Sequence, residues 1–287
     1  MTVVPSPALP PAGLVDPHNA FTVDLEEWFH VCGAGGELAA DCWEQLPSRV
    51  ELTTRLMLDL LDRVQVPATF FVVGWVAERY PRLIEDVRRA GHTIGSHSYS
   101  HTRAYELGPE RFRDDLRRSV RALADVGVSD VVCYRAPEWS INNRSLWALD
   151  ELVQERFRID ASMAPLKMVG DTSFPRAPHH RATPNGVLLE VPPLVADRFG
   201  QVMPMGWGWG LRMSSPSRVL RTIDAANRKG RGAVLTVHPW EIDPEPPRVR
   251  LGPRLHFAHY FRLSGFVDRL REVLRHTAFG RIDELLV

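Results

Sequence analysis

The sequence predicts an α/β fold, a distorted (β/α) barrel of about seven parallel strands in a single domain. Short runs rich in β-branched and aromatic residues alternate with segments in which apolar residues recur every three or four positions. No linker interrupts this alternation, which favours one domain over two. Charged residues and histidines follow directly on several of the short runs, as expected at the carboxyl ends of barrel strands.

Seven short segments have the composition of strands in a parallel sheet. The run ATFFVVG at 68–74 is apolar, β-branched and aromatic without interruption, which is typical of a strand covered on both faces. AFTVDL at 20–25 and AVLTVH at 233–238 are similar, but each carries a polar residue near its end. The expected strands occupy 20–25, 68–74, 92–96, 131–135, 158–162, 187–191 and 233–238.

The helices are predicted from apolar spacing and from the residues that begin and end helices. Ser48 has capping-box spacing to Glu51 and is expected to begin the first helix. Pro81 suits the first turn of the second helix, and Gly91 suits its end. After the helix that starts at Ser48, the expected helices occupy 81–91, 109–126, 145–155, 216–228 and 266–275.

The 287 residues are enough for one large domain or two small ones. Residues 1–19 begin with a proline-rich stretch and are interpreted as an extended lead-in. We expect one catalytic domain over 20–287, with a C-terminal extension from about residue 241. Segments 163–186 and 192–215 show no clear pattern and are interpreted as long loops, which in compact domains are often functional.

Composition argues against several classes of partner. Lys+Arg and Asp+Glu number 35 each, so net charge gives no bulk attraction to nucleic acid or to an anionic membrane. Three cysteines are too few for a disulfide framework. No apolar run approaches the ~20 residues of a membrane-spanning helix, and the first residues lack the pattern of a secretory signal. We therefore expect a cytoplasmic protein with no nucleic-acid partner and no membrane span, and the oligomeric state stays open.

Two histidines follow the expected strand at 92–96. In the stretch HTIGSHSYSH, three residues separate His97 from His101. If the segment formed one helical turn, the two imidazoles would point the same way and could share a metal ion. A pair of histidines without a metal is the alternative at this point.

Charged side chains mark the ends of other expected strands. Asp24 and Glu26 end the first strand, and Arg135 ends the fourth. Asp160 ends the fifth strand and His238 the last. Individually each has an ordinary interpretation, such as a cap, a surface ion pair, a turn or a packed histidine. Because the carboxyl ends of barrel strands meet at one mouth, we expect these residues to converge with the histidine pair.

Five segments of the chain resemble the five motifs of the NodB-homology polysaccharide deacetylases, carbohydrate esterase family 4. In chain order, these segments are TVDLEE, HTIGSHSYSH, YRAPEW, IDAS and LTVHPWE. The resemblance runs from about residue 21 to residue 238, and the ordered set is far more specific than any one motif. The D-x-E form of the first motif and the HPWE of the last resemble a subgroup linked to bacterial exopolysaccharide gene clusters. The resemblance implies metal-dependent removal of N-acetyl groups from an N-acetylhexosamine unit of a polysaccharide or its precursor.

The resemblance also implies a divalent metal, expected to be Zn²⁺ with Co²⁺, Mn²⁺ or Ni²⁺ as substitutes, held by a carboxylate and two imidazoles. His97 and His101 match the family's two histidine ligands. Many members carry adjacent aspartates in the first motif, whereas here Leu25 follows Asp24 and cannot bind a metal. Glu26 lies on the same side of an extended strand as Asp24, so it is the expected third ligand.

Catalytic roles carry over in the same way. Asp24 is the expected general base, and a protonated His238 is the expected acid that donates to the leaving amine. The resemblance further implies that Arg135 orients Asp24, and that Asp160 orients His238 and raises its pKa. A backbone N–H near 137–139 would stabilise the oxyanion.

Substrate contacts are expected from the third and last motifs and from the glycine-rich segment PMGWGWG. Its two indoles offer a flat platform for a sugar, or they simply pack within their own loop. Departures in the motifs leave the acyl group less certain than the reaction class. The expected substrate-binding residues are Pro137, Glu138, Trp139, Leu235, Trp207 and Trp209.

Other interpretations stay open. Relatives of the family act on further C–N bonds, so an N-formyl sugar, a cyclic imide or a ureide is an alternative substrate. A carbohydrate-binding pseudoenzyme is a second alternative, but it predicts a lost ligand or base and none is lost. Among the remaining histidines, the adjacent His179 and His180 should diverge, whereas His256 and His259 could form a second pair or reach the substrate.

Overall fold

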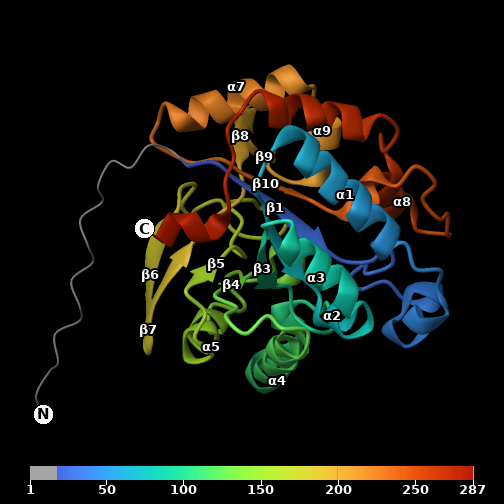
Figure 1. The fold of residues 1–287 in the computed structure, drawn as a ribbon. Helices are drawn as coiled ribbons and strands as arrows, with labels where there is room; N and C mark the ends of the chain where they lie inside the picture. The colour runs from blue at the N-terminus through green and yellow to red at the C-terminus, as the bar shows by residue number, and fades with distance from the viewer. Residues whose placement is uncertain (1–17, 199, 287) are drawn as a thin grey trace, which may run out of the picture.

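An eight-stranded sheet in the order β10-β1-β2-β3-β4-β5-β7-β6 lies at the centre of the computed structural model, which describes residues 18–198 and 200–286 (Figure 1). Seven strands run parallel, and the edge strand β6 is antiparallel to β7. A separate hairpin pairs β8 with β9. The strands are β1 (Ala20–Leu25), β2 (Thr69–Val72), β3 (Thr93–Ser96), β4 (Cys133–Tyr134), β5 (Ile159–Asp160), β6 (His179–Thr183), β7 (Gly186–Glu190), β8 (Val195–Arg198), β9 (Gln201–Pro204) and β10 (Val234–Val237).

The predicted barrel of about seven parallel strands is confirmed in a curled, open form, because β10 and β6 stand at opposite ends of the strand order. All seven predicted strands are present, most of them shorter than expected. The prediction of two long loops is wrong in part, because these segments contain β6, β8, β9 and a short helix. β6 has the sequence HHRAT and is half-buried to exposed along its length, so it lacks the apolar alternation that marks a strand. The predicted lead-in falls almost entirely outside the described residues.

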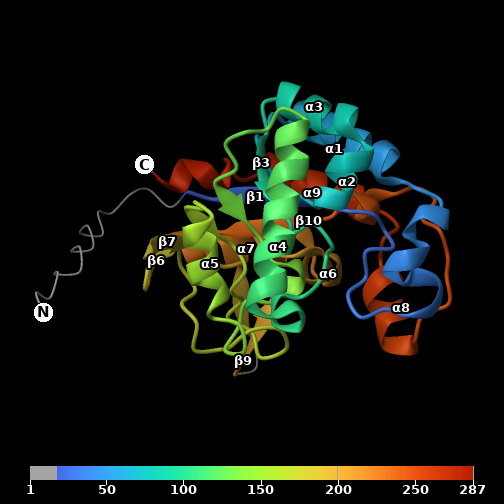
Figure 2. The ribbon, with the colours of Figure 1, turned by 90° about the horizontal axis from the view of Figure 1, so that it is seen from below.

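The helices follow the strands as predicted and cover the sheet (Figures 1 and 2). Pro109 begins a straight helix as expected, but one further turn precedes it, joined through Gly108 at φ 72°. The helices are α1 (Val50–Val64), α2 (Gly74–Arg79), α3 (Pro81–Arg89), α4 (Ala104–Asp125), α5 (Ala148–Gln154), α6 (Gly208–Met213), α7 (Pro216–Asn227), α8 (Pro253–Tyr260) and α9 (Phe266–Arg275).

The capping box predicted at the first helix does not form. The Ser48 hydroxyl donates to the carboxylate of Glu27 instead of capping the helix. That carboxylate accepts the backbone N–H groups of Arg49 and Val50, at 3.1 and 3.3 Å. A residue of the first motif thus caps α1, because a carboxylate is a strong acceptor for the free N–H groups at a helix start.

Register brings the carboxyl ends of the parallel strands to one rim. Leu25 pairs with Val72, Val72 with Ser96, and Ser96 with Tyr134. Tyr134 in turn pairs with Asp160. Because these last residues lie side by side across the sheet, the residues that follow them must emerge at the same edge. The predicted convergence therefore has a direct cause in the strand register.

Alternation along β1 separates the core from the site. Phe21, Val23 and Leu25 point into the main hydrophobic cluster, which includes buried residues of α1, α3, α7 and α9. Thr22 and Asp24 therefore point to the other side of the sheet, although both are at most 2% exposed. A buried aspartate needs polar partners, because an unpaired buried charge is costly. The concave side of the sheet is where those partners lie.

The C-terminal extension packs against the segment that follows β1. Trp28, Phe29 and Trp43 share one hydrophobic cluster with Trp240 and Tyr260. In Figures 1 and 2, α8 accordingly lies beside the blue segment after β1. The part of the extension that holds α8 is thus joined to the rim of the sheet, whereas α9 packs against the outer helices α1 and α7.

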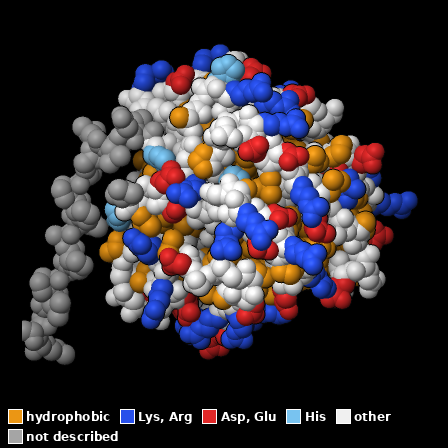
Figure 3. Space-filling view, in the orientation of Figure 1, with side chains coloured by type: hydrophobic (Ala, Val, Ile, Leu, Met, Phe, Trp, Pro, Cys, Tyr) orange, Lys and Arg blue, Asp and Glu red, His pale blue; other side chains and the backbone are white. Residues whose placement is uncertain are grey.

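Positive and negative side chains are interspersed over the face seen in Figure 3, as expected from equal numbers of acidic and basic residues. In the part of the chain that the structure describes, every helix is too short or too polar to cross a bilayer.

Candidate functional site

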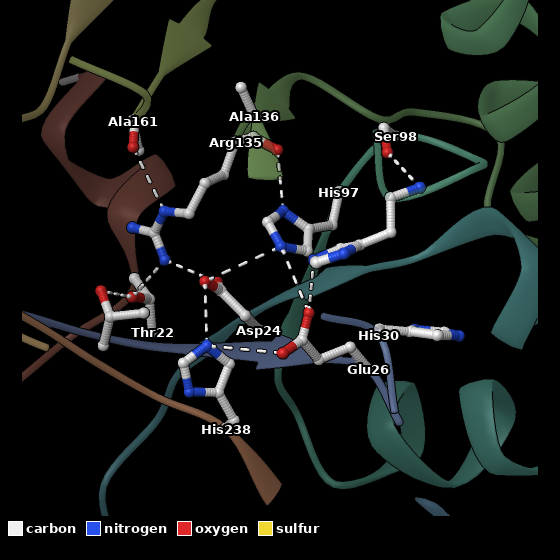
Figure 4. A network of polar contacts seen from close by, with 12 residues as sticks. Thr22, Asp24, Glu26, His30, His97, Ser98, Arg135, Ala136, Ala161 and His238 are labelled. Carbon is white, nitrogen blue, oxygen red and sulfur yellow. Dashed lines mark hydrogen bonds and ion pairs between the residues drawn. The ribbon is translucent and has the colours of Figure 1, made fainter. Parts of the chain in front are cut away.

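Asp24 and Arg135 form a buried ion pair on the concave side of the sheet. Nη1 of Arg135 donates to Oδ1 of Asp24 at 2.7 Å and to the hydroxyl of Thr22 at 2.8 Å. Its Nε donates to the carbonyl of Ala161 at 3.2 Å. The guanidinium therefore fixes one oxygen of Asp24, and the other oxygen faces His97 and the centre of the site (Figure 4). Both predicted residues lie as the sequence analysis expected.

Glu26, His97 and His101 form a group that could hold a metal ion. One ligand atom from each lies within 4.8 Å of the other two, and all three residues are buried. Oε2 of Glu26 is 2.5 Å from Nε2 of His101 and 3.9 Å from Nε2 of His97. The carboxylate two residues past Asp24 therefore does reach the histidine pair, as its place on the same side of the strand predicted.

The two histidines converge through a loop and not through the helical turn that their spacing suggested. Both follow β3, and Ser98 and His101 adopt left-handed backbone conformations at φ 62° and 51°. The Ser98 hydroxyl accepts the backbone N–H of His101 at 3.0 Å and stabilises this tight turn. Non-glycine residues with positive φ are uncommon and are often found at functional sites.

Hydrogen bonds outside the ligand group fix its imidazoles. Nδ1 of His97 donates to the carbonyl of Arg135 at 2.8 Å, which leaves Nε2 with a free lone pair toward Glu26. Nδ1 of His101 lies 3.5 Å from the sulfur of Cys32. The ring of His30 stacks on that of His101 at 5.6 Å. The hydrogen bond of His97 keeps the tautomer that a metal requires.

The chemistry of the group fits a divalent metal. Oε2 of Glu26 is buried and lies next to Nε2 of His101 and of His97, so the donor atoms of all three residues face one another. Burial alone would raise the pKa of Glu26, but the charges of His101, His238 and His97 outweigh it and hold the pKa well below its usual range. Catalytic zinc sites use donor sets of this kind, with two imidazoles and one carboxylate, and leave further coordination positions of the metal open.

His238 is oriented by Glu241 and not by Asp160. Nδ1 of His238 lies 3.1 Å from Oε2 of Glu241, and its Nε2 lies 4.0 Å from Asp24 and 3.6 Å from Glu26. Burial would lower the pKa of His238, but Glu26, Glu241 and Asp24 together raise it to about 9. The prediction that His238 is protonated near neutral pH agrees with this, whereas the carboxylate assigned to orient it is corrected.

Asp160 instead supports the turn that follows β4. Its carboxylate accepts the hydroxyl of Ser162, and that hydroxyl in turn accepts the backbone N–H of Ala136 at 2.7 Å. Burial raises the pKa of Asp160 to about 6, and the neighbouring Glu190, also fully buried, has its pKa raised by burial and by the charge of Asp160. Asp160 therefore shapes the segment that carries Arg135, and this contact replaces the predicted one.

Glu241 is held in place by a buried arginine that the sequence analysis missed. Nε of Arg212 lies 2.9 Å from Oε1 of Glu241, and both residues are at most 2% exposed. The remaining nitrogens of Arg212 donate to the carbonyls of Ala258, His259 and Phe261 at 2.6 to 3.1 Å. The guanidinium therefore joins the HPWE segment to the end of α8.

A glycine makes room for this carboxylate. A Cβ atom at Gly208 would lie 1.9 Å from Oε2 of Glu241, so no larger residue fits there without displacing the carboxylate. Glu241 follows His238 by three residues, a spacing that could have suggested it. Arg212 gives no such signal, since only the tertiary structure buries it.

A cavity of about 210 Å³ opens over these groups. Glu138, Trp139, Trp207 and Trp209 line it as predicted, although Glu138 also binds Arg103, with Nε of the arginine at 2.7 Å. Pro137 and Leu235 are not among its lining residues, which corrects two predictions. Leu235 points to the opposite side of β10, into the main core with Phe21, because side chains alternate along a strand. Among the described residues, the cavity is also lined by His30, Val31, Arg212, Trp240, Leu255, Ala258 and His259.

Aromatic rings form two walls of this cavity. The indoles of Trp139 and Trp207 stack at 4.5 Å. On the other side, Trp240 stacks between His238 at 5.2 Å and His259 at 4.3 Å, and its indole N–H donates to Glu26. Flat apolar walls around polar groups are typical of sites that bind sugar rings.

The remaining histidines do not form a second ligand pair. His259 is buried in the cavity wall, whereas His256 is exposed and contacts Tyr260. His179 and His180 lie on β6, where neighbouring side chains point to opposite faces. Of the described residues, Glu26, His97 and His101 are the group close enough to share a metal.

Two family models match the chain. The model for polysaccharide deacetylases matches residues 39–155, and a model for a domain of unknown function, DUF3473, matches residues 161–287. The first spans the histidine pair and the turn after β4, and the second spans β10 and the C-terminal extension.

Curated relatives match over part of their length. A peptidoglycan-N-acetylglucosamine deacetylase of Bacillus cereus is 29% identical over 103 residues, which is 36% of this chain and 37% of the relative. A peptidoglycan deacetylase of Helicobacter pylori is 27% identical over 145 residues, which is 50% of this chain and 48% of the relative. The chain thus spans less than half the length of either relative.

Solved structures share the fold over nearly the whole chain. A polysaccharide deacetylase candidate from Mycobacterium smegmatis superposes with a TM-score of 0.64 at 20% identity, covering 98% of this chain and 93% of the other. A second such candidate, from Pseudomonas aeruginosa, gives 0.59 at 16% identity, covering 93% and 89%. The matched family model, the ordered motifs and the curated relatives thus support a NodB-homology polysaccharide deacetylase of carbohydrate esterase family 4, and the two solved structures show the shared fold.

Proposed function

We propose that the protein is a metal-dependent hydrolase that removes N-acetyl groups from an N-acetylhexosamine unit of a polysaccharide or its precursor. The observation that carries this proposal is the placement of Asp24, Glu26 and His238 around one cavity, with a carboxylate and two histidines able to share a metal. The names of the curated relatives, which act on peptidoglycan and chitin, support a carbohydrate amide as the substrate.

Glu26, His97 and His101 would hold the metal, for which Zn²⁺ is proposed. When bound, such an ion polarises a carbonyl and lowers the pKa of water toward ~7. The chain's own residues supply the proton transfers. Asp24, fixed on one side by Arg135, has its second oxygen free to accept a proton from the attacking water.

The hydrolysis needs two proton transfers. Water adds to the amide carbonyl carbon and gives up one proton to Asp24. The C–N bond then breaks, and His238 donates its Nε2 proton to the departing nitrogen, which leaves as a free amine beside acetic acid, and the acetic acid loses its proton to solvent to give acetate. The pKa of His238, raised to about 9, keeps that proton available at neutral pH.

The aromatic walls suit a hexosamine. A pyranose ring can stack on the half-buried indole of Trp209, and the neighbouring carboxylates can accept hydrogen bonds from its hydroxyls. The D-x-E and HPWE forms of the motifs favour an exopolysaccharide as the polymer, through their resemblance to the subgroup linked to such gene clusters. This polymer class is part of the proposal.

A direct test measures the released acid. The purified protein, loaded with Zn²⁺, is incubated with chitohexaose, with the corresponding N-formyl oligosaccharide and with allantoin. We expect acetate from the first substrate and little turnover of the others. Formate or ureide hydrolysis as the dominant activity would favour another C–N bond. No turnover of any amide, together with tight oligosaccharide binding, would favour the pseudoenzyme.

A further inference from the structure

A second hollow shares the lining residue Trp209 with the catalytic cavity. We call it the basic groove. It has a volume of about 500 Å³ and lies between the β8–β9 hairpin and α7. Because Trp209 lines both the basic groove and the catalytic cavity, the two hollows adjoin at this residue. A chain that leaves the catalytic cavity past this indole would enter the basic groove.

The basic groove carries a local excess of positive charge. Six cationic side chains line it, and Asp197 is its one carboxylate among the described residues. Asp197 is already paired with Arg176, whose Nη1 lies 2.8 and 3.0 Å from the two carboxylate oxygens. The cationic residues are Arg176, Arg198, Arg218, Arg221, Lys229 and Arg231.

Four of these cations are free to bind an anion. Within the described part of the chain, Arg218, Arg221, Lys229 and Arg231 have no carboxylate within ion-pair distance. By comparison, Arg113 and Arg117 each pair with an acid of a neighbouring helix. Since the protein has no net charge, the excess is local to the basic groove.

The floor of the basic groove is apolar. Leu194, Met203 and Met205 lie under the charged rim, with Ala225 of α7 opposite. Leu194 and Met205 are at most 6% exposed, so the floor is continuous with the core. An apolar floor and a charged rim match a sugar ring that carries an acidic group, because the ring offers an apolar face and the acid projects from its edge.

We propose that the basic groove binds anionic residues of the substrate glycan, next to the N-acetyl sugar in the catalytic cavity. The anionic group is a carboxylate of a uronic acid or a phosphate, since arginine binds either. The inference rests on the proposed function, because it takes the glycan to run from one hollow to the other. A glycan is favoured over a membrane surface because the cations line a concave site that adjoins the catalytic cavity.

Measurements of glycan binding test this inference independently of amide hydrolysis. The Asp24→Asn variant prevents turnover and allows calorimetry with three hexasaccharides: one alternating N-acetylglucosamine with glucuronate, its carboxyl-reduced neutral form, and one with phosphodiester links. We expect the neutral form to bind about tenfold more weakly than at least one acidic form at low salt. The advantage should shrink as the salt concentration rises. Which acidic form binds best identifies the source of the anion.

A double variant that removes two positive charges tests which residues of the basic groove bind the anion. Arg221→Gln with Arg231→Gln should remove most of the advantage of the acidic form and leave binding of the neutral form unchanged. The matched control, Arg82→Gln with Arg88→Gln, removes two exposed charges from α3 and should change neither. Equal binding of acidic and neutral forms, or equal losses in both double variants, would overturn the inference. So would anionic vesicles that bind the protein through Arg221 and Arg231 while the glycans show no preference.

Acetate release from neutral chitohexaose distinguishes the two proposals. If the double variants and the wild type all release acetate but no charge preference exists, the proposed function stands and the basic groove has no such role. If no acetate is released while the charge preference is present, the binding site stands without the deacetylase.

Discussion

The carboxylate of Glu241 lies 3.1 Å from Nδ1 of His238 and belongs to the same short segment, HPWE. It also accepts the backbone N–H of His238 at 3.0 Å, so the two residues form a closed unit at the start of a 3-10 helix. Arg212 holds the opposite oxygen of the carboxylate. The orientation of the proposed acid is thus set within its own motif and anchored to the C-terminal extension.

Glu241→Gln should lower kcat on an N-acetyl sugar and move the alkaline limb of its pH profile to lower pH. The reason is that Glu241 helps to raise the pKa of His238 to about 9, and activity that needs protonated His238 is lost as pH rises through that pKa. Measurements of kcat on chitohexaose over a range of pH locate this alkaline limb.

Asp160→Asn is the comparison variant, because its carboxylate contacts Ser162 and not His238. Its alkaline limb should stay in place even if kcat falls through a shift of the turn after β4. A limb that moves in Asp160→Asn and stays fixed in Glu241→Gln would reverse the assignment of the two carboxylates.

Replacing either proposed histidine ligand should reduce metal content. His97→Ala or His101→Ala removes one of three donors that lie within 4.8 Å of each other, so elemental analysis should find substoichiometric zinc after gel filtration. His259→Ala is the control, because this imidazole lines the same cavity outside the ligand group and should leave the metal content unchanged. Full occupancy in both ligand variants would place the metal elsewhere.

Substitutions of Asp24 and Glu26, the two acids of the first motif that line the cavity, should give opposite phenotypes. Asp24→Asn should keep the metal and lose about 100-fold or more in kcat, because it removes the proton acceptor. Glu26→Gln should lose metal, since an amide is a far weaker ligand than a carboxylate. Metal analysis paired with kcat measures both, and an exchange of the two outcomes would exchange the roles.

His238→Ala should lower the rate of amide hydrolysis far more than the rate of hydrolysis of an activated ester. An amine must be protonated as it leaves, whereas a phenolate leaves without a proton. We expect a loss of ~10²- to 10⁴-fold on an N-acetyl sugar and a much smaller loss on an aryl acetate. Equal losses on the two substrates would give His238 a structural or metal-linked role.

His92 should make the fold less stable as pH falls. Its Nδ1 accepts the backbone N–H of Ala68 at 3.1 Å, and burial, with a smaller effect of Arg281, lowers its pKa to about 4. The unfolded chain, with an ordinary histidine pKa near 6.5, then binds more protons between pH 6.5 and 4, so unfolding becomes easier over that range. Protonation of Nδ1 would also remove the acceptor of the hydrogen bond from the backbone N–H of Ala68.

Urea unfolding at several pH values measures this effect. His92→Gln should lose less free energy of unfolding between pH 7 and 4 than the wild type, by up to about 3 kcal/mol. The control is His276→Gln, an exposed histidine after α9, which should follow the wild type. An unchanged pH dependence in His92→Gln would show that His92 does not titrate with folding.

The sequence by itself determined the strand alternation and the identities of most groups at the rim. Local patterns suffice for these, since an apolar run such as 68–74 needs no partner to be identified as a strand. The placement of Glu26 was also predictable, because the twofold periodicity of a strand puts it on the side of Asp24. The ordered motifs then named the family before any geometry was available.

Only the tertiary structure decided which carboxylate meets His238, because that depends on how far each strand end extends over the rim. Asp160 is fully buried at the end of β5 and faces Glu190 and Ser162, whereas Glu241 is turned back by its short helix. Arg212 reaches Glu241 from α6, about 30 residues earlier in the chain, a contact that no local pattern encodes. The edge strand β6 was missed for the same physical reason, since its pairing with β7 and not its own composition makes it a strand.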